Sequence, residues 1–348
     1  MKIPTKMKAL TKKLPQKGIW LEEVAVPKPP YGWALIRVKK TSICGTDLHI
    51  YGWDAWSQRH IKPPMIIGHE FMGEIVEING DGNGFKVGDK VTAEGHVVCG
   101  RCQNCRCERQ HLCPNTKGIG VSMQGIFAEY AIAPVYNLWK CDSAISDDLY
   151  AVFDAFGNAV HTALSFPVVA KNVLITGAGP IGIMAAAVVK FAGAKNVVLT
   201  NTSDWRLGLA NKVCPGVLTI NTKTHNIEEL MKKHGIENGF DVGLEMSGAQ
   251  AGLNLLIKNM MMGGSVALLG LFGEGATIDW DKVIFGALNI KGIYGREMFN
   301  TWNQMDGLLK GGLKMDAIIT DKFHYTDFQK GFELMESKKC GKVILEWN

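Results

Sequence analysis

Apolar and polar residues alternate along much of the first half of the chain, and this period of two predicts short strands. The strand-like runs are residues 7–13, 19–26, 34–44, 66–78, 88–96 and 125–135. Pro27 and Pro29 and a group of glycines between residues 80 and 88 separate these runs and indicate turns. Short strands joined by glycine-rich turns are typical of a β-barrel-like domain.

The hydrophobic period changes after residue 145. Ser146 can cap a helix over residues 145–166, interrupted near Gly157. From residue 171 onward, apolar runs alternate with helical stretches, which predicts α/β units around a parallel sheet. Strands are predicted at 173–176, 196–200, 240–248, 264–270 and 287–297, and helices at 227–234 and 251–262.

The tail from Thr301 has the pattern of a helix, a strand, a second helix and a terminal strand, and we expect it to rejoin the first domain. The sequence therefore predicts an α/β protein of two domains. The first would comprise residues 1–152 and 300–348, including a cysteine-rich lobe at about 96–115, and the second residues 153–299.

Composition and charge narrow the functional classes. The net charge of +5 is spread over 348 residues, and the N-terminal lysines lack the density of a nucleic-acid-binding stripe. Residues 1–13 lack the apolar core of a secretory signal, and no apolar run is long enough to span a membrane. Most of the nine cysteines form one cluster, which indicates metal binding in a reducing cytoplasm rather than a disulfide framework.

That cluster, between Cys99 and Cys113, predicts a structural zinc site. Four thiolates at close spacing can surround one tetrahedral zinc and leave no open position. The spacing favours Cys99, Cys102, Cys105 and Cys113. Cys107, two residues after Cys105, is the expected non-ligand, and His111 is a weaker candidate. A closed site of this kind stabilises a loop that has little core of its own.

A second group of metal-binding residues opens at Cys44 and closes at His69 and Glu70. A thiol, an imidazole and a carboxylate suit a zinc ion that keeps one position open for a substrate oxygen. Thr46 and His49 follow the thiol closely and are candidates for a proton relay. The aromatic residues of this stretch can either pack in the core or line a substrate pocket: Tyr51, Trp53 and Trp56.

A glycine-rich loop follows the predicted strand at 173–176 and opens a helix, which is the context of a dinucleotide fingerprint. Gly177 allows the tight turn, Gly179 lets the backbone approach a pyrophosphate, and Gly182 lets helix and strand pack closely. Asn201 ends the next strand, where an acid usually binds the adenosine ribose. Its neutral amide does not repel a 2′-phosphate and Arg206 is nearby, yet we expect NAD rather than NADP.

An open zinc site together with a dinucleotide site predicts hydride transfer. The zinc would stabilise the alkoxide of an alcohol substrate, and the nicotinamide would accept the hydride. The proton released from the hydroxyl would leave through Thr46 and His49.

Five motifs occur in one order along the chain: Cys44-Gly45-Thr46-Asp47, Gly68-His69-Glu70, Gly88-Asp89-Lys90-Val91, the four-cysteine lobe and GAGPIG. In these motifs the sequence resembles the zinc-dependent medium-chain dehydrogenases over its whole length. Longer blocks resemble the members that oxidise L-threonine: CGTDLHIYGWDAWSQ, FGNAVHTALSF, FDVGLEMSG, IDWDKVIF and KGIYGREMF. The resemblance implies a GroES-like catalytic domain, a Rossmann cofactor domain, NAD-dependent oxidation of the threonine hydroxyl to 2-amino-3-oxobutanoate, two zinc ions per chain and a homotetramer.

The resemblance also implies individual roles. At the catalytic zinc it implies Cys44, His69 and Glu70; in proton relay Thr46, His49 and Asp154; and at the structural zinc Cys99, Cys102, Cys105 and Cys113. As cofactor contacts it implies Ile181, Asn201, Arg206, Leu269, Gly270, Leu271, Ile293 and Tyr294.

Two alternatives stay open at the level of sequence. A polyol or other secondary-alcohol dehydrogenase could use the same scaffold with a different pocket. A non-enzymatic zinc module that binds nucleic acid would use the cysteine lobe, but it would leave GAGPIG and the residues around His69 without a role.

Overall fold

The structure, a computed structural model, describes residues 3–347 and divides into two compact units. The first unit comprises residues 1–155 and 319–348, and the second residues 156–318. The sequence placed the second boundary earlier, at residue 300. The segment 300–318 stays with the second unit because Trp302 and Met305 are fully buried, with the Met305 sulfur close to Gly157.

The first unit is mostly β-structure. Its strands are β1 (Lys6–Lys12), β2 (Trp20–Ala25), β3 (Trp33–Ile43), β4 (Met65–Ile66), β5 (Phe71–Asn79), β6 (Lys90–Ala93), β7 (His96–Val97), β8 (Lys117–Gly118), β9 (Tyr130–Pro134), β10 (Leu138–Lys140), β17 (Ile319–His324) and β18 (Lys342–Glu346). Its helices are α1 (Gly45–Gly52), α2 (Ala55–His60), α3 (Gln103–Arg106), α4 (Asp147–Tyr150) and α12 (Phe328–Glu336). Helix α5 (Phe153–Ala163) crosses the boundary between the units.

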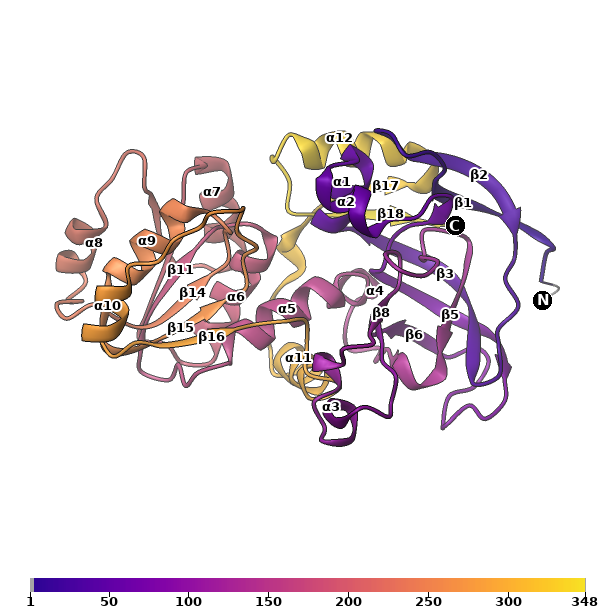
Figure 1. Ribbon diagram of the computed structural model, residues 1–348, viewed down its shortest axis with the longest axis horizontal. Coiled ribbons are helices and arrows are strands. Elements are labelled where there is room, and N and C mark those ends of the chain that lie inside the picture. The colour runs from indigo at the N-terminus through magenta and orange to yellow at the C-terminus, as the bar shows by residue number, and fades with distance from the viewer. Residues whose placement is uncertain (1–2, 348) are drawn as a thin grey trace. The chain divides into compact units, whose positions relative to one another are not determined.

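The main sheet of the first unit has seven strands in the order β10-β6-β5-β3-β18-β17, with β9 also paired to β3. The C-terminal strand β18 runs antiparallel beside β3, with Val343 opposite Ile43 (Figure 1). The terminal strand therefore belongs to the main sheet of the first unit. This pairing places Lys342 next to the end of β3, where Cys44 follows.

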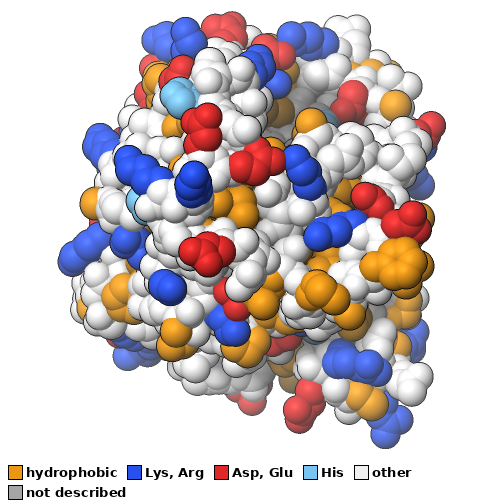
Figure 2. All heavy atoms as spheres, turned by 90° about the vertical axis from the view of Figure 1, so that its left-hand side faces the viewer, with side chains coloured by type: hydrophobic (Ala, Val, Ile, Leu, Met, Phe, Trp, Pro, Cys, Tyr) orange, Lys and Arg blue, Asp and Glu red, His pale blue; other side chains and the backbone are white. Residues whose placement is uncertain are grey.

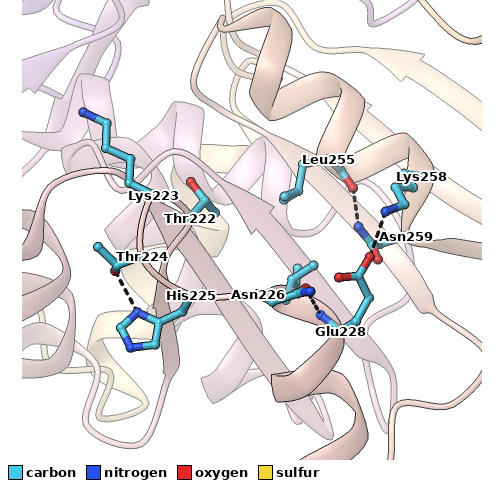
Figure 3. Close-up of a pocket in the computed structure, with 10 residues that line it drawn as sticks. Thr222, Lys223, Thr224, His225, Asn226, Glu228, Leu255, Lys258 and Asn259 are labelled. Atoms are coloured by element: carbon cyan, nitrogen blue, oxygen red, sulfur yellow. Dashed lines mark hydrogen bonds and ion pairs between the residues drawn. The ribbon is translucent and has the colours of Figure 1, made fainter.

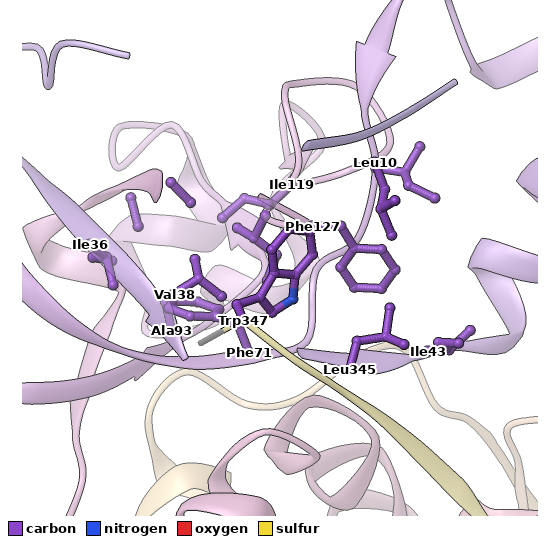
Figure 4. Packing of buried hydrophobic residues seen from close by; sticks show 14 of the residues in the cluster. Leu10, Ile36, Val38, Ile43, Phe71, Ala93, Ile119, Phe127, Leu345 and Trp347 are labelled. Atoms are coloured by element: carbon purple, nitrogen blue, oxygen red, sulfur yellow. The ribbon is translucent and has the colours of Figure 1, made fainter. Parts of the chain in front are cut away.

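Inward-facing residues of β3, β5 and β18 form the core of the first unit (Figure 4). Ile36, Val38 and Leu345 are fully buried, which the alternation in the sequence anticipates. Trp347 closes this core, and its indole nitrogen donates a hydrogen bond to Thr41 Oγ1 at 2.8 Å. The buried indole therefore keeps a polar partner, which ties the chain end to β3.

The second unit is a parallel sheet with helical connections. Its strands are β11 (Asn172–Thr176), β12 (Asn196–Asn201), β13 (Leu218–Asn221), β14 (Phe240–Glu245), β15 (Met260–Leu268) and β16 (Asn289–Gly292). Its helices are α6 (Pro180–Phe191), α7 (Asp204–Val213), α8 (Ile227–Lys233), α9 (Gln250–Lys258), α10 (Trp280–Phe285) and α11 (Asn300–Lys310). The strand order β13-β12-β11-β14-β15-β16 reverses direction next to β11, and ligands of such sheets bind at this switch point.

Four local predictions were wrong. The run 66–78 is not one strand, because Gly68 turns the chain with a φ of +88° and leaves His69 in a loop between β4 and β5. The helix predicted to reach residue 262 ends at Lys258, and the following methionines begin β15, since an apolar run fits either period. The strand predicted over 287–297 is confined to β16. The helix break near Gly157 lies earlier, between α4 and α5.

Gly157 lies inside α5, and we expect Gly157→Ala to destabilise the protein. A Cβ there would lie 2.2 Å from Cδ of Arg296, whose side chain is fully buried and cannot swing away. Overpacking of this kind costs about 1–3 kcal/mol. Gly208→Ala in α7 is the matched control: open space surrounds its Cβ position, so the free energy of unfolding should rise by about 0.5–1 kcal/mol. Thermal unfolding of both variants measures the difference, and equal melting temperatures would contradict the clash.

Candidate active site and metal centres

The first candidate centre forms where β3 ends. Cys44 follows β3 and caps α1, while His69 and Glu70 lie in the loop that precedes β5. Their ligand atoms lie within 4.8 Å of one another, so one metal ion could contact all three. Glu70 Oε1 is buried and has no hydrogen-bond partner among the described residues. A buried carboxylate oxygen in that state fits a metal ligand, because it would otherwise be left unsatisfied.

Asp47, which the sequence did not single out for a role, supports this centre from α1. Its Oδ2 accepts a hydrogen bond from the Cys44 backbone at 2.9 Å, and its Oδ1 lies 3.9 Å from His69 Nδ1. A carboxylate behind a histidine fixes the orientation of the ring at many metal sites.

Acidic groups surround His69 in this cluster. Burial raises the pKa of Asp47 to about 6, although the neighbouring His69 opposes the shift. Burial would lower the pKa of His69, but the charges of Cys44 and Asp47 outweigh it and hold that pKa well above its ordinary value. Three acidic groups around one imidazole thus attract positive charge, which a divalent cation would supply.

A buried cation, Lys342, lies on the other side of Glu70. Its Nζ is 2.7 Å from Glu70 Oε2, and both side chains are almost completely inaccessible to solvent. The Lys342 ammonium also donates a hydrogen bond to the Ile43 carbonyl at 3.1 Å. Burial would lower the pKa of Lys342, but the charges of Glu70 and Cys44 raise it. Glu70 is therefore placed between a fixed cation and the candidate metal position.

The proposed relay residues on α1 become more exposed to solvent from Thr46 to His49. Thr46 Oγ1 is 3.9 Å from the Cys44 sulfur, and the His49 side chain is 58% exposed. His49 Nδ1 lies 2.5 Å from Asp54 Oδ2, a partner that the sequence analysis missed. A hydroxyl near the thiol and an imidazole near solvent are suited to carry a proton outward.

Asp154 is placed close to the same centre, in the first turn of α5. A Cβ added at Gly95 would lie 3.4 Å from Asp154 Oδ2 and 3.9 Å from His69 Cβ, so Gly95 separates the two side chains. Asp154 is not a member of the cluster of Cys44, His69 and Glu70.

Next to Gly95, the fully buried Glu94 accepts a hydrogen bond from the His96 backbone at 3.0 Å and lies 2.8 Å from His96 Nδ1. The sequence analysis assigned no role to this carboxylate–imidazole pair.

The second candidate centre is the cysteine lobe. The structure brings together Cys99, Cys102, Cys105 and Cys113, with sulfur–sulfur distances of 3.4, 3.6 and 3.8 Å. A tetrahedron with metal–sulfur bonds of about 2.3 Å has edges of about 3.8 Å, so the four sulfurs fit one zinc ion. Cys107 is exposed and lies outside the cluster, as does His111.

The pKa values of two of these thiols, Cys99 and Cys105, shift in opposite directions. Hydrogen bonds from the backbone of Arg101 and Cys102 lower the pKa of Cys99 to about 6, whereas burial raises the pKa of Cys105 to about 12. Burial disfavours the charged thiolate of Cys105, and the hydrogen bonds that its thiol makes with Cys102 and Cys113 also favour the neutral form. A bound cation would stabilise the thiolate instead, which again fits a closed zinc site.

The glycine loop of the second unit has the geometry of a pyrophosphate cradle. Gly177 has a φ of +102°, and a Cβ at Gly182 would lie only 1.9 Å from the Gly177 carbonyl oxygen. A Cβ at Gly179 would meet open space, and Gly179 caps α6. The free N–H groups at this helix end therefore face a clear approach for a dinucleotide phosphate.

The other expected cofactor residues collect at the same edge, where the strands of a parallel sheet all end. Ile181 lies in the first turn of α6, Asn201 ends β12, Leu269–Leu271 follow β15, and Ile293–Tyr294 follow β16. Asn201 Oδ1 accepts hydrogen bonds from the backbone of Thr202 and Ser203 at 2.9 and 3.0 Å. Only the amide nitrogen of Asn201 is then left to face an adenosine ribose. Arg206 lies in the first turn of α7.

A separate hollow of about 390 Å³ lies between the loop after β13 and the end of α9 (Figure 3). Its polar groups bind one another: Glu228 pairs with Lys258 at 2.7 Å, and Asn259 donates to the Leu255 carbonyl at 2.7 Å. Its side chains need no ligand for satisfaction, and we assign none.

Charged side chains of both signs are interspersed on the face shown in Figure 2. A mixed surface of this kind lacks the single-sign stripe of a nucleic-acid-binding face. Among residues 3–347, no helix combines the length and apolar character needed to cross a membrane.

Comparison with known proteins agrees with this geometry. The alcohol dehydrogenase GroES-like domain family matches residues 30–143, and the zinc-binding dehydrogenase family matches residues 180–311. An L-threonine 3-dehydrogenase of Vibrio cholerae is 53% identical over 98% of this chain and 99% of its own. Two solved structures each have 26% sequence identity to this chain. An Escherichia coli alcohol dehydrogenase complexed with NADH has a TM-score of 0.88 over 99% of this chain and 100% of its own. The 2R,3R-butanediol dehydrogenase of Bacillus subtilis has a TM-score of 0.87 over 98% and 100%.

These findings confirm the expected pairing of a GroES-like domain with a Rossmann domain. With half of its residues shared over almost the full length, the chain belongs to the zinc-binding alcohol dehydrogenase family and, within it, to the L-threonine 3-dehydrogenases.

Proposed function

We propose that this protein oxidises the side-chain hydroxyl of L-threonine to 2-amino-3-oxobutanoate and reduces NAD. The observation that carries the proposal is the cluster of Cys44, His69 and Glu70, which offers a metal three ligands of the type found at open catalytic zinc sites. The near-complete match to L-threonine 3-dehydrogenases supports the choice of substrate.

In this proposal each residue of the first unit has a defined task. Cys44, His69 and Glu70 hold a zinc ion, and Asp47 orients the His69 ring. When bound, zinc acts as a Lewis acid toward the hydroxyl oxygen of the substrate. Thr46 accepts the hydroxyl proton as its own hydroxyl proton passes on to His49, which releases a proton to solvent, with Asp54 stabilising the charged imidazole. Asp154 assists this proton transfer from its place near His69.

The second unit binds NAD in the proposal, and the first unit carries the substrate. Bound NAD supplies a nicotinamide that accepts a hydride. Backbone groups of Gly177, Gly179 and Gly182 receive the pyrophosphate. The remaining contacts are assigned to Ile181, Asn201, Arg206, Leu269, Gly270, Leu271, Ile293 and Tyr294. We further propose that Cys99, Cys102, Cys105 and Cys113 hold a second, structural zinc.

The substrate assignment is tested by NADH formation from L-threonine, sorbitol and butane-2,3-diol under identical conditions. We expect the highest kcat/KM with L-threonine. Preference for butane-2,3-diol would favour the alternative secondary-alcohol dehydrogenase, which the likeness to the Bacillus subtilis enzyme keeps open. Absence of NADH formation with L-threonine would refute the proposal.

Cofactor choice gives a separate prediction. Because Asn201 is neutral, nothing at this position repels a 2′-phosphate, so we expect NAD to be preferred only moderately. Asn201→Asp should raise the kcat/KM ratio of NAD over NADP by about tenfold or more, because the new carboxylate would repel the 2′-phosphate of NADP. A tenfold change corresponds to about 1.4 kcal/mol. An unchanged ratio would show that Asn201 does not face the adenosine ribose.

We also propose a cytoplasmic homotetramer. The strand β16 is the edge of the sheet in the second unit, and its backbone groups face outward on one side. Exposed apolar side chains also occur on α10, which precedes β16 in the chain: Trp280, Ile284 and Phe285. An exposed edge strand with apolar neighbours suits pairing with a second copy. Sedimentation equilibrium measures the mass, and a monomer at micromolar concentration would exclude the assembly.

A further inference from the structure

A buried carboxylate lies beneath the candidate pyrophosphate loop and has no task so far. Glu245 is the last residue of β14, and its side chain is completely buried. Its Oε1 accepts hydrogen bonds from the Ser247 backbone at 2.9 Å, from the Ser247 hydroxyl, and from Thr176 Oγ1 at 3.4 Å. Its Oε2 accepts one from the Gly248 backbone at 3.2 Å. One carboxylate thus binds both the end of β11 and the turn after β14.

Both of these segments touch the glycine loop. Thr176 directly precedes Gly177 in the chain, and a Cβ at Gly177 would lie 2.8 Å from the Ser247 nitrogen. The turn that Glu245 holds is therefore packed against the first glycine of the fingerprint. A shift of Ser247 by a few tenths of an ångström would move Gly177 or open a gap beside it.

Glu245 also contacts the turn that follows β15. A Cβ at Gly270 would lie 2.2 Å from Glu245 Oε2, so only glycine can lie against the carboxylate there. The Leu269 and Gly270 backbones donate hydrogen bonds to the Glu245 carbonyl at 3.0 and 3.1 Å. Three of the segments that end at the carboxyl edge of the sheet therefore meet at this one residue.

The chemistry of the contacts requires a carboxylate. Both oxygens accept hydrogen bonds from backbone N–H groups, which are donors only. Glutamine would turn an NH2 group toward one of these donors and lose that bond. Burying a carboxylate costs free energy unless hydrogen bonds of this kind satisfy it. Loss of one of these bonds would leave a buried backbone N–H group without its acceptor, and we expect the turn to move as a result.

We propose that Glu245 is a positioning residue for the dinucleotide: it fixes the Gly177–Gly179 loop and the Leu269–Gly270 turn in the arrangement that receives the pyrophosphate. The inference rests on the proposed NAD function. Glu245 lies behind the loop and acts through Ser247 and Gly270 rather than on the cofactor itself.

The chain offers a matched control at the opposite end of the same strand. Asp241 accepts hydrogen bonds from the Asn172 backbone at 2.9 Å and from Lys171 Nζ at 3.0 Å, far from the carboxyl edge. Glu245→Gln and Asp241→Asn therefore make the same chemical change at the two ends of β14. Ser247→Ala, which removes one donor and keeps the charge, is a second test should Glu245→Gln not fold.

Dissociation constants for NADH, ADP-ribose and AMP would be measured by calorimetry on the zinc-loaded protein. Glu245→Gln should raise the Kd of NADH and ADP-ribose by about tenfold, the size of one lost hydrogen bond to a charged group. The Kd of AMP, which lacks the pyrophosphate, should rise by a smaller factor in Glu245→Gln. Asp241→Asn should change the Kd of each ligand by less than about twofold. Ser247→Ala should shift NADH and ADP-ribose in the same direction as Glu245→Gln, by a smaller factor.

Two results would overturn the inference. Unchanged NADH affinity in a folded Glu245→Gln or Ser247→Ala variant would show that the carboxylate is only structural. Equal losses for AMP and ADP-ribose would show a general disturbance of the sheet edge. Failure of the unmodified protein to bind NADH would instead contradict the proposed function itself.

Discussion

Replacing Cys44 by serine is expected to abolish turnover while leaving the fold intact. The thiol is one of three candidate ligands at the open metal centre, and its sulfur lies 3.9 Å from Thr46 Oγ1. The Asp47 carboxylate accepts a hydrogen bond from the Cys44 backbone, so this part of the cap of α1 survives the change. A Lewis acid contributes several kcal/mol to such a reaction, and its loss should lower kcat by about a thousandfold or more.

Metal content and unfolding separate this outcome from misfolding. Cys44→Ser should contain about one zinc per chain instead of two, because the cysteine lobe lies elsewhere in the first unit and keeps its metal. The matched control is Cys107→Ser, an exposed thiol outside both clusters, which should retain activity and both metals. A Cys44→Ser protein with near-normal turnover would place the active site elsewhere.

The cysteine lobe and the glycine loop could be predicted from sequence because their geometry is local. Cys99 to Cys113 lie within fifteen consecutive positions, so a short loop is enough to bring their sulfur atoms together at one site. Gly177, Gly179 and Gly182 likewise belong to one strand–turn–helix unit. In both places residue type and spacing determine the structure without knowledge of the rest of the chain.

The buried cation beside Glu70 could not be predicted, because it arises from strand pairing. Lys342 begins the terminal strand in an apolar run, and only the pairing of β18 with β3 places its ammonium beside Glu70. Asp54 and Glu94 lie only five and two residues from His49 and His96 along the chain, but an acid near a histidine in the sequence does not by itself indicate a contact. The one sequence signal that could have indicated a role for Lys342 is its place in an apolar run that predicts a buried strand. A lysine in such a strand needs a partner, because an unpaired lysine is rarely buried.

Replacing Lys342 by methionine is expected to destabilise the metal-free protein strongly. Methionine fills a similar volume, but it leaves Glu70 buried without its cation at 2.7 Å and removes one hydrogen-bond donor from the Ile43 carbonyl. Breaking a buried ion pair on one side costs about 3–5 kcal/mol. The zinc-loaded protein should lose less, because the metal then becomes the remaining cation for Glu70, and binding to the folded state stabilises it.

Two further variants determine whether the uncompensated charge is the cause. Adding Glu70→Gln to Lys342→Met removes the buried charge and should restore much of the lost free energy of unfolding, which a double-mutant cycle measures. Lys322→Met, on the neighbouring strand β17, removes a partly exposed lysine that shares Asp148 with Lys40, and should cost less than about 1 kcal/mol. If the double variant were as unstable as Lys342→Met, packing rather than the charge of Glu70 would explain the loss. Rescue confined to the metal-free protein would instead show that Glu70 exchanges one cation for the other, which requires it to reach the zinc.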